Sequence, residues 1–198
     1  MIPKATTLMF LGRSGSGKDT QIAMLLKRPD FTDAIETNTG NIFRKMAKKE
    51  TIVGRKVKEI LETGGLTPGW LSFSAWFSYL VKQAKGDEIL FAAGSPRRME
   101  EAQLEDRALE FLGRPKPIGV HIMVSRQEAK KRLSLRKRHD DTEESIEARL
   151  AWFDEDVLPI IEHYRKERRL IEIDGEGTPQ EVFSKLESGV ADYFSKKQ

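Results

Sequence analysis

The chain has 198 residues, of which 38% are hydrophobic and 33% are charged, and its formal net charge is +3. This length and composition indicate one folded domain with a substantial core, and they exclude a disordered or membrane-embedded chain. The sequence has no cysteine, which excludes disulfide bonds and a cysteine-bound structural zinc and favours a cytoplasmic protein.

Apolar runs that suit buried strands alternate with amphipathic stretches that suit helices. Strands are predicted at residues 6–11, 34–36, 88–92, 118–124 and 170–173. Helices are predicted at residues 18–26, 40–49, 55–62, 70–84, 98–111, 126–135, 143–153, 158–166 and 180–194. The alternation favours an α/β fold in which a five-stranded parallel sheet carries helices on both faces.

Two segments interrupt this alternation and are predicted to be insertions. Residues 38–69 hold two helices and the turn GGLTPG before the next strand, and residues 136–142 form a polar break between two helices. Both are expected at the carboxyl ends of the strands, where open α/β sheets bind ligands. The sequence thus predicts a core of residues 1–37, 70–135 and 143–198 that carries two flaps.

A glycine-rich turn follows the first predicted strand. Residues 12–21 read GRSGSGKDTQ and come directly after the apolar run at 8–11. Strand, glycine spacing, lysine and helix in this order are typical of a loop whose backbone amides and Lys18 bind phosphate. Asp19 stands where the general pattern has a serine or threonine that binds magnesium. Its carboxylate should repel phosphate unless a cation intervenes.

Arginines are spread through the chain beside the loops at the predicted strand ends. A guanidinium stays charged and can bind two phosphate oxygens at once, so several that converge could neutralise the phosphates of two substrates. The set is Arg44, Arg97, Arg132, Arg136, Arg138 and Arg149. Some belong to a basic run at 126–138 that could also bind nucleic acid. The run lacks interleaved aromatic residues for base stacking, which favours a phosphate lid and no nucleic-acid partner.

Several motifs, taken together, resemble adenylate kinase in their order and spacing. They are residues 12–21, TGNIFR at 39–44, GSPR at 94–97, RHDDTEE at 138–144 with Arg149, and DGEGTP at 174–179. The resemblance covers nearly the whole chain. It implies a P-loop NTPase-like three-layer sandwich with a monophosphate-binding flap at 38–69 and a short lid at 136–142. It also implies a monomer that converts ATP and AMP into two ADP with Mg²⁺, and the short lid leaves no room for a zinc-bearing lid domain.

The resemblance assigns a role to individual residues. ATP would be bound by Gly15, Ser16, Gly17, Lys18, Asp19, Thr20, Arg132, Arg136, Gly177, Thr178 and Pro179. AMP would be bound by Thr39, Gly40, Arg44, Gly65, Thr67, Gly94, Arg97, Glu101, Arg138 and Arg149. The catalytic residues would be Lys18, Arg97, Arg138 and Arg149, because phosphoryl transfer depends on alignment and charge neutralisation. Asp140 and Asp141 would orient the lid arginines.

The chain departs from the family pattern at the metal site and at the acceptor base. Ala93 replaces an aspartate that is thought to hold magnesium through water, and Asp19 replaces a glycine. One hypothesis is that Asp19 takes over the metal-organising role, through water. The other is that phosphates and water hold the metal and that Asp19 only favours the helix N-terminus.

Glu101 replaces the family's glutamine, and an ionised carboxylate only accepts hydrogen bonds. It could accept from the amino group of adenine, whereas guanine offers two donors on one edge. AMP is the expected acceptor, and GMP, CMP or UMP are alternatives. A nucleotide-binding regulator with weak catalysis is a further alternative.

Overall fold

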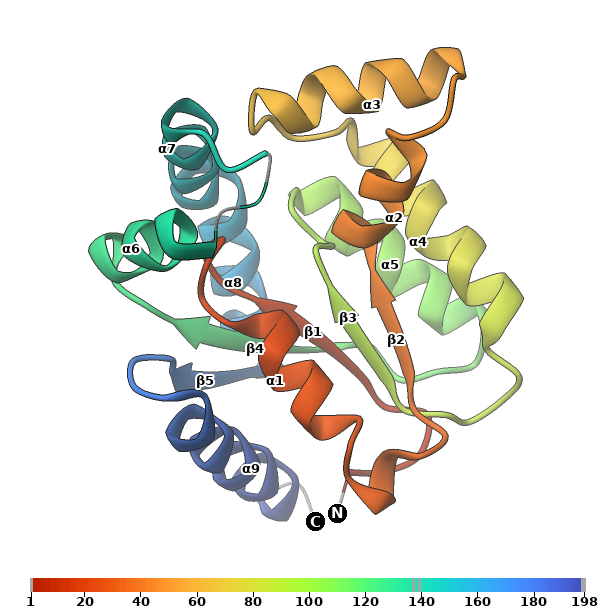
Figure 1. Ribbon diagram of the computed structural model, residues 1–198. Helices are drawn as coiled ribbons and strands as arrows, with labels where there is room; N and C mark the ends of the chain where they lie inside the picture. The colour runs from red at the N-terminus through yellow and green to blue at the C-terminus, as the bar shows by residue number, and fades with distance from the viewer. Residues whose placement is uncertain (1, 137, 139, 197–198) are drawn as a thin grey trace.

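The computed structural model describes residues 2–136, 138 and 140–196. Lys137 and His139 of the predicted lid, and residues 1, 197 and 198 of the predicted core, lie outside this description. Five strands form one parallel sheet in the order β2-β3-β1-β4-β5. They are β1 (Thr7–Leu11), β2 (Ile35–Asn38), β3 (Leu90–Ala93), β4 (Ile118–Met123) and β5 (Leu170–Asp174). The predicted five-stranded α/β fold is therefore confirmed (Figure 1).

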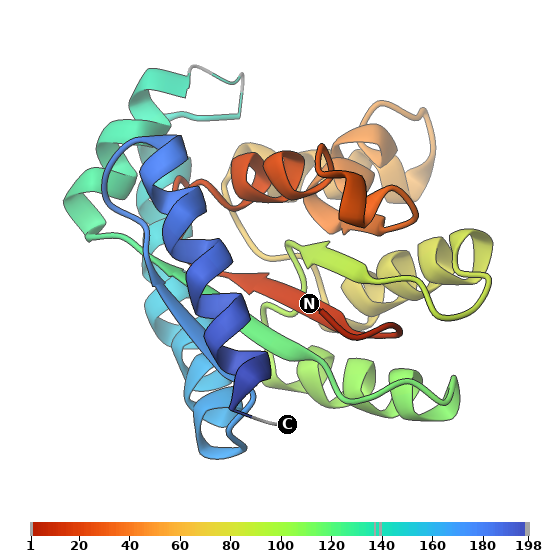
Figure 2. The ribbon, with the colours of Figure 1, turned by 90° about the horizontal axis from the view of Figure 1, so that it is seen from below.

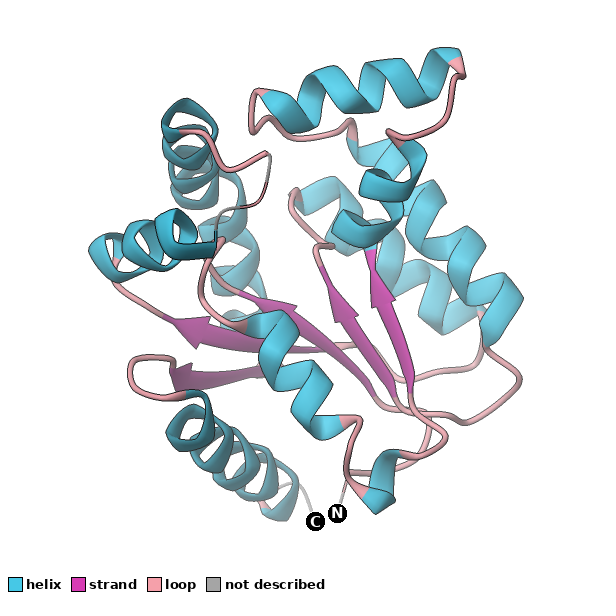
Figure 3. Ribbon diagram, in the orientation of Figure 1, coloured by secondary structure: helices cyan, strands magenta, loops and turns pink. Residues whose placement is uncertain are grey.

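Helices make the connections between the strands (Figure 3). They are α1 (Lys18–Leu25), α2 (Thr39–Met46), α3 (Ile52–Glu62), α4 (Gly69–Gln83), α5 (Met99–Phe111), α6 (Arg126–Arg136), α7 (Glu143–Trp152), α8 (Leu158–Lys166) and α9 (Pro179–Ser195). The sequence predicted each of these to within a few residues. It missed a 3₁₀ turn at Pro29–Phe31 and a π turn at Phe153–Val157 that joins α7 to α8. None of the helices in the described part of the chain is long and apolar enough to span a membrane.

The sheet is buried on both faces because side chains alternate along each strand. On β1, Leu8 and Phe10 belong to a cluster with Ile22 of α1 and Leu186 of α9. Met9, which points the other way, joins a cluster on the opposite face with residues of α4 and α5, namely Trp76, Leu80, Ala108 and Leu109. Figure 2 shows α1 and α5 on opposite sides of β1, as this alternation requires.

The two predicted insertions stand over the carboxyl edge of the sheet, on either side of β1. The α2–α3 segment follows β2, and the loop between α6 and α7 follows the helix after β4. Figure 1 shows these segments facing each other above the strand ends, with the β1–α1 loop below the end of α6. The topology therefore brings residues from five connections to one edge.

Candidate active site

The loop between β1 and α1 is folded around the Lys18 ammonium group. Lys18 Nζ donates hydrogen bonds to the carbonyl oxygens of Gly12 (2.7 Å) and Arg13 (2.8 Å) and to Ser16 Oγ (3.2 Å). Gly15 has a φ of 87°, and a Cβ there would lie 2.7 Å from the carbonyl oxygen of Ala129, so only glycine fits. Burial lowers the pKa of Lys18 to about 8. A bound phosphate would supply the counter-charge that restores its usual pKa.

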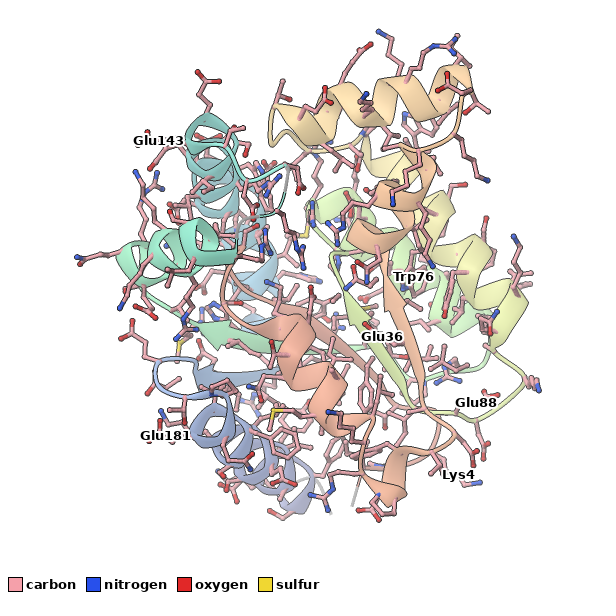
Figure 4. All side chains as sticks on the ribbon, viewed as in Figure 1. Lys4, Glu36, Trp76, Glu88, Glu143 and Glu181 are labelled. Carbon is pink, nitrogen blue, oxygen red and sulfur yellow. The ribbon has the colours of Figure 1, made fainter. Side chains whose placement is uncertain are left out.

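One cavity of about 400 Å³ opens at the carboxyl edge of the sheet. It is lined by most of the residues that the sequence singled out: Gly15, Ser16, Gly17, Lys18, Asp19, Thr20, Gly40, Arg44, Gly65, Thr67, Gly94, Arg97, Arg132, Arg136, Arg138, Arg149, Gly177 and Pro179. Figure 4 shows nitrogen-bearing side chains gathered between the α6–α7 and α2–α3 segments. The site therefore combines a phosphate-type loop with a strongly positive wall.

Three residues predicted to bind nucleotide do not line this cavity. The Thr178 side chain caps α9 by accepting from the Glu181 N–H (3.3 Å). Thr39 is buried as the first residue of α2. Glu101 is also buried, and its Oε2 accepts from the Arg97 N–H (3.0 Å) and from Ser95 Oγ (3.2 Å). This oxygen of Glu101 therefore binds the chain just before α5, and a contact of Glu101 with the acceptor base stays a prediction.

The lid arginines are held by a pair of aspartates. Arg136 donates to Asp141 through Nε (2.9 Å) and Nη2 (2.7 Å), and Arg149 Nη1 donates to the same carboxylate at 2.7 Å. Arg149 Nη2 also reaches Asp140 Oδ2 at 3.0 Å. Burial alone would raise the pKa of Asp141, but the hydrogen bonds and charges of these arginines lower it. The predicted contact between the aspartates and the lid arginines is present.

Arg44 of α2 and Arg97 before α5 also line the cavity. Arg44 Nη2 donates to Asn41 Oδ1 at 2.6 Å, and the Arg97 guanidinium lies 5.1 Å from the ring centre of Trp152. Burial, and then the charge of Arg138, lower the pKa of Arg44, and burial lowers that of Arg97. The charged guanidinium groups repel their cationic neighbours, and an anion bound between them would relieve this repulsion.

Asp19 faces the cavity across from α2. Its Oδ1 accepts from Asn38 Nδ2 (3.2 Å), and its Oδ2 lies 3.9 Å from Arg138 Nη2. Its side chain is 49% exposed, so water can reach it. At the end of β3, Ala93 offers only a methyl group. One accessible carboxylate beside a phosphate-type loop fits a magnesium ion, which binds one or two carboxylates plus phosphate and water oxygens.

Comparison with known proteins agrees with this geometry. A family model described as "Adenylate kinase" matches residues 10–169, which run from β1 to the start of β5. The chain belongs to the adenylate kinase family. The match includes both inserted segments and every arginine that lines the cavity.

Individual adenylate kinases are similar over almost their whole length. One from Thermus thermophilus is 30% identical, covering 92% of this chain and 96% of the relative. One from Prochlorococcus marinus is 30% identical, covering 93% and 98%. "Adenylate kinase 1" of a Nostoc species is 30% identical, covering 92% and 97%.

Within this adenylate kinase fold, three cavity residues have contacts that sequence reasoning missed. Asn38 caps α2 by accepting from the Asn41 N–H (3.0 Å) while it donates to Asp19. Gln21 Nε2 donates to the carbonyl oxygen of Pro179 (3.0 Å), which ties α1 to the loop before α9. Trp152 stacks on Arg97. Its position three residues after Arg149 puts both on one side of α7, a signal that was available in the sequence.

The helix α7 also contacts the end of the α2–α3 segment of this adenylate kinase. Arg149 Nη2 donates to the carbonyl oxygen of Leu61 (3.4 Å), and Trp152 Nε1 donates to that of Gly64 (3.0 Å). Gly64 has a φ of 71°, and a Cβ there would collide with the backbone carbonyl of Ser145. Helix α7 and the end of the α2–α3 segment are thus in direct contact.

The basic run on α6 is largely paired with acidic side chains of α6 and α7. Arg126 Nη2 binds Glu147 (2.6 Å), Lys130 Nζ binds the same carboxylate (2.7 Å), and Arg132 Nε binds Glu128 (2.7 Å). The pairs of Arg126 and Lys130 are solvent-exposed and each contributes little to stability, whereas Arg132 lines the cavity. They neutralise much of the charge that suggested a nucleic-acid surface.

Proposed function

We propose that the chain catalyses reversible, magnesium-dependent phosphoryl transfer from ATP to AMP, which gives two ADP. The observation that carries this proposal is the single cavity into which the Lys18 loop and six arginines converge from opposite sides. Family membership gives the same activity. A cavity lined by one phosphate-binding loop and by arginines from two directions can hold two nucleotides with their phosphate groups side by side.

The residues divide between a donor and an acceptor. The amides of residues 15–20 and Lys18 would bind the ATP phosphates, and Arg132 with the 177–179 loop would border the ATP base. Arg44 and Arg97 would bind the AMP phosphate, and Arg136, Arg138 and Arg149 would close on the transferred group. Little covalent chemistry is asked of these side chains, because alignment and neutralisation of oxygen charge lower the barrier.

The same proposal gives the inserted segments their roles. Residues 38–69 would form the monophosphate-binding flap, and residues 136–142 the lid that excludes water from the triphosphate. A bound Mg²⁺ neutralises charge on the β and γ oxygens. We also propose that the enzyme acts as a monomer, as the resemblance implies. Since ATP and AMP are cytoplasmic metabolites, we place the enzyme in the cytoplasm.

The acceptor base is tested by initial rates with AMP, GMP, CMP and UMP at fixed ATP. We expect AMP to exceed each of the others by about tenfold or more, the discrimination typical of a site that hydrogen-bonds its substrate. A higher rate with GMP would reverse this assignment. ATP binding without ADP formation from any acceptor would instead indicate a regulator.

The role of Asp19 is tested by Asp19→Gly. We expect the free Mg²⁺ concentration at half-maximal rate to rise about tenfold or more, as for loss of a partner in the outer shell of a metal. Asn38→Ala is the matched variant, because it removes the hydrogen bond to Asp19 and keeps the carboxylate, so its Mg²⁺ dependence should stay near that of the wild type. Unchanged Mg²⁺ dependence in Asp19→Gly would show that phosphates and water suffice.

A further inference from the structure

A buried polar cluster lies beneath the chain that carries Arg97 and outside the cavity. Its members are Ser95, Glu101 and Glu105, each at most 1% exposed. Ser95 Oγ is within hydrogen-bonding distance of Glu101 Oε2 (3.2 Å) and also contacts Glu105 Oε1. Glu101 Oε2 accepts as well from the Arg97 N–H at 3.0 Å. The cluster forms a continuous path from the middle of α5 to the backbone of Arg97.

The number of hydrogens in this cluster fixes its protonation. A serine hydroxyl has one hydrogen and can donate to only one of the two carboxyl groups that it touches. Toward the other it must accept, and an ionised carboxylate has no hydrogen to donate. One of the two glutamates therefore carries a proton. Glu101 already accepts from the Arg97 N–H, so the chain of donors runs from Glu105 through Ser95 to Glu101.

The surroundings of Glu105 keep it neutral. Burial, and then the neighbouring charges of Glu101 and Asp106, raise its pKa well above the ordinary value, against the hydrogen bond of Ser95. Tyr164 of α8 also faces it, and the pKa of that buried hydroxyl is raised as well. The nearby cation Arg169 is held by Asp106 at 2.8 Å. Among the described residues Glu105 Oε2 has no hydrogen-bond partner, so an ionised Glu105 would be an unpaired buried charge.

We propose that Glu105 is a positioning residue: a buried carboxylic acid that, through Ser95 and Glu101, fixes the backbone from which Arg97 reaches the acceptor phosphate. This inference rests on the proposed function, which assigns Arg97 to AMP. Glu101 and Glu105 are four residues apart on α5, where two like charges normally destabilise a helix. The proton on Glu105 removes one of these two charges, and Ser95 then joins the two carboxyl groups by hydrogen bonds.

The test compares Glu105→Gln with Glu105→Leu in the full chain. Glutamine is neutral at every pH and its amide can donate to Ser95, whereas leucine cannot. At saturating ATP, we expect Ser95→Ala to raise KM for AMP about tenfold, the loss of one hydrogen bond to a charged group. Glu105→Leu should raise it about fivefold, the loss of one hydrogen bond between neutral groups. KM for ATP should change much less. Glu105→Gln should restore KM for AMP to near the wild-type value.

The pH profile supplies a result that a merely structural role would not give. As the pH rises and Glu105 loses its proton, KM of the wild type for AMP should increase, whereas that of Glu105→Gln should stay flat over the same interval. The folded protein holds this proton more tightly than the unfolded chain. The free energy of unfolding should therefore fall as the pH rises above about 4.5, and fall less in Glu105→Gln.

Two further measurements make the outcome decisive. Asp106→Asn, the neighbouring buried carboxylate that pairs with Arg169, should lower stability and keep a KM for AMP that rises with pH. The rise should shift to lower pH, because one of the charges that raise the pKa of Glu105 is lost. Burial raises the pKa of Glu101 to about 7, so infrared spectra are compared above that pH, where Glu101 is mostly ionised. There the wild type should show a protonated carboxylic acid band that Glu105→Gln lacks. Parallel pH profiles for the wild type and Glu105→Gln, or absence of that band, would overturn the inference. Absence of kinase activity in the wild type would instead overturn the proposed function.

Discussion

Replacement of Lys18 by methionine is expected to lower kcat by a factor of about 10² to 10³, the usual loss when a preorganised charge at the transferring group is removed. Lys18 is the cation at the centre of the phosphate loop, and its Nζ is already positioned by three loop oxygens. The substitution keeps most of the side-chain volume and removes the charge. Initial rates at saturating ATP and AMP measure the effect.

Lys27→Met is the control for this substitution, since Lys27 is an exposed lysine just beyond the end of the same helix. Its kcat should match that of the wild type. Because burial lowers the pKa of Lys18 to about 8, kcat/KM for ATP in the wild type should also decline as the pH rises through that value. If kcat of Lys18→Met falls by less than about fivefold, too little for a preorganised transition-state charge, Lys18 is not the cation assigned here.

Arg149→Ala is expected to abolish measurable transfer and to lower the free energy of unfolding by about 3 to 5 kcal/mol, the cost of breaking a buried ion pair. The side chains of Asp140 and Asp141 that it binds are 3% and 0% exposed, so two carboxylates would lose a buried partner. Chemical denaturation measures the stability. Arg165→Ala, an exposed arginine that also binds two carboxylates, should cost no more than about 1 kcal/mol.

A second substitution separates the two roles of Arg149. Asp140→Asn in the Arg149→Ala background removes the carboxylate whose ion partner is Arg149 and should recover part of the lost stability, without recovering activity. Recovery of activity together with stability would mean that Arg149 acts only by holding the lid in shape. A stability of Arg149→Ala equal to the wild type would contradict the buried network itself.

The fold could be predicted from the sequence because its signals are local. The period of two in the apolar strands, the glycines before Lys18 and the Thr178-Pro179 start of α9 each act over a few residues. The phosphate loop and the arginines could be predicted for the same reason, since a parallel sheet brings all carboxyl ends to one edge.

The orientation of individual side chains could not be predicted in the same way. The sequence did not predict that Glu101 Oε2 accepts from Ser95 and the Arg97 N–H, because this depends on how the turn before α5 folds. The hydrogen bond from Asn38 to Asp19 joins residues 19 positions apart on different strand ends. Such contacts depend on angles between elements that no local pattern contains.

The contact between α7 and the end of α3 has a consequence for nucleotide affinity. Both hydrogen bonds there end on main-chain oxygens, those of Leu61 and Gly64, so no substitution at either position can delete the acceptor. The donors of both hydrogen bonds are side chains of α7, Arg149 and Trp152, so substitutions at these two positions can remove the contact. Any coupling between the binding of ATP and of AMP across this contact obeys thermodynamic linkage. The factor by which ATP changes the affinity for AMP must equal the factor by which AMP changes the affinity for ATP.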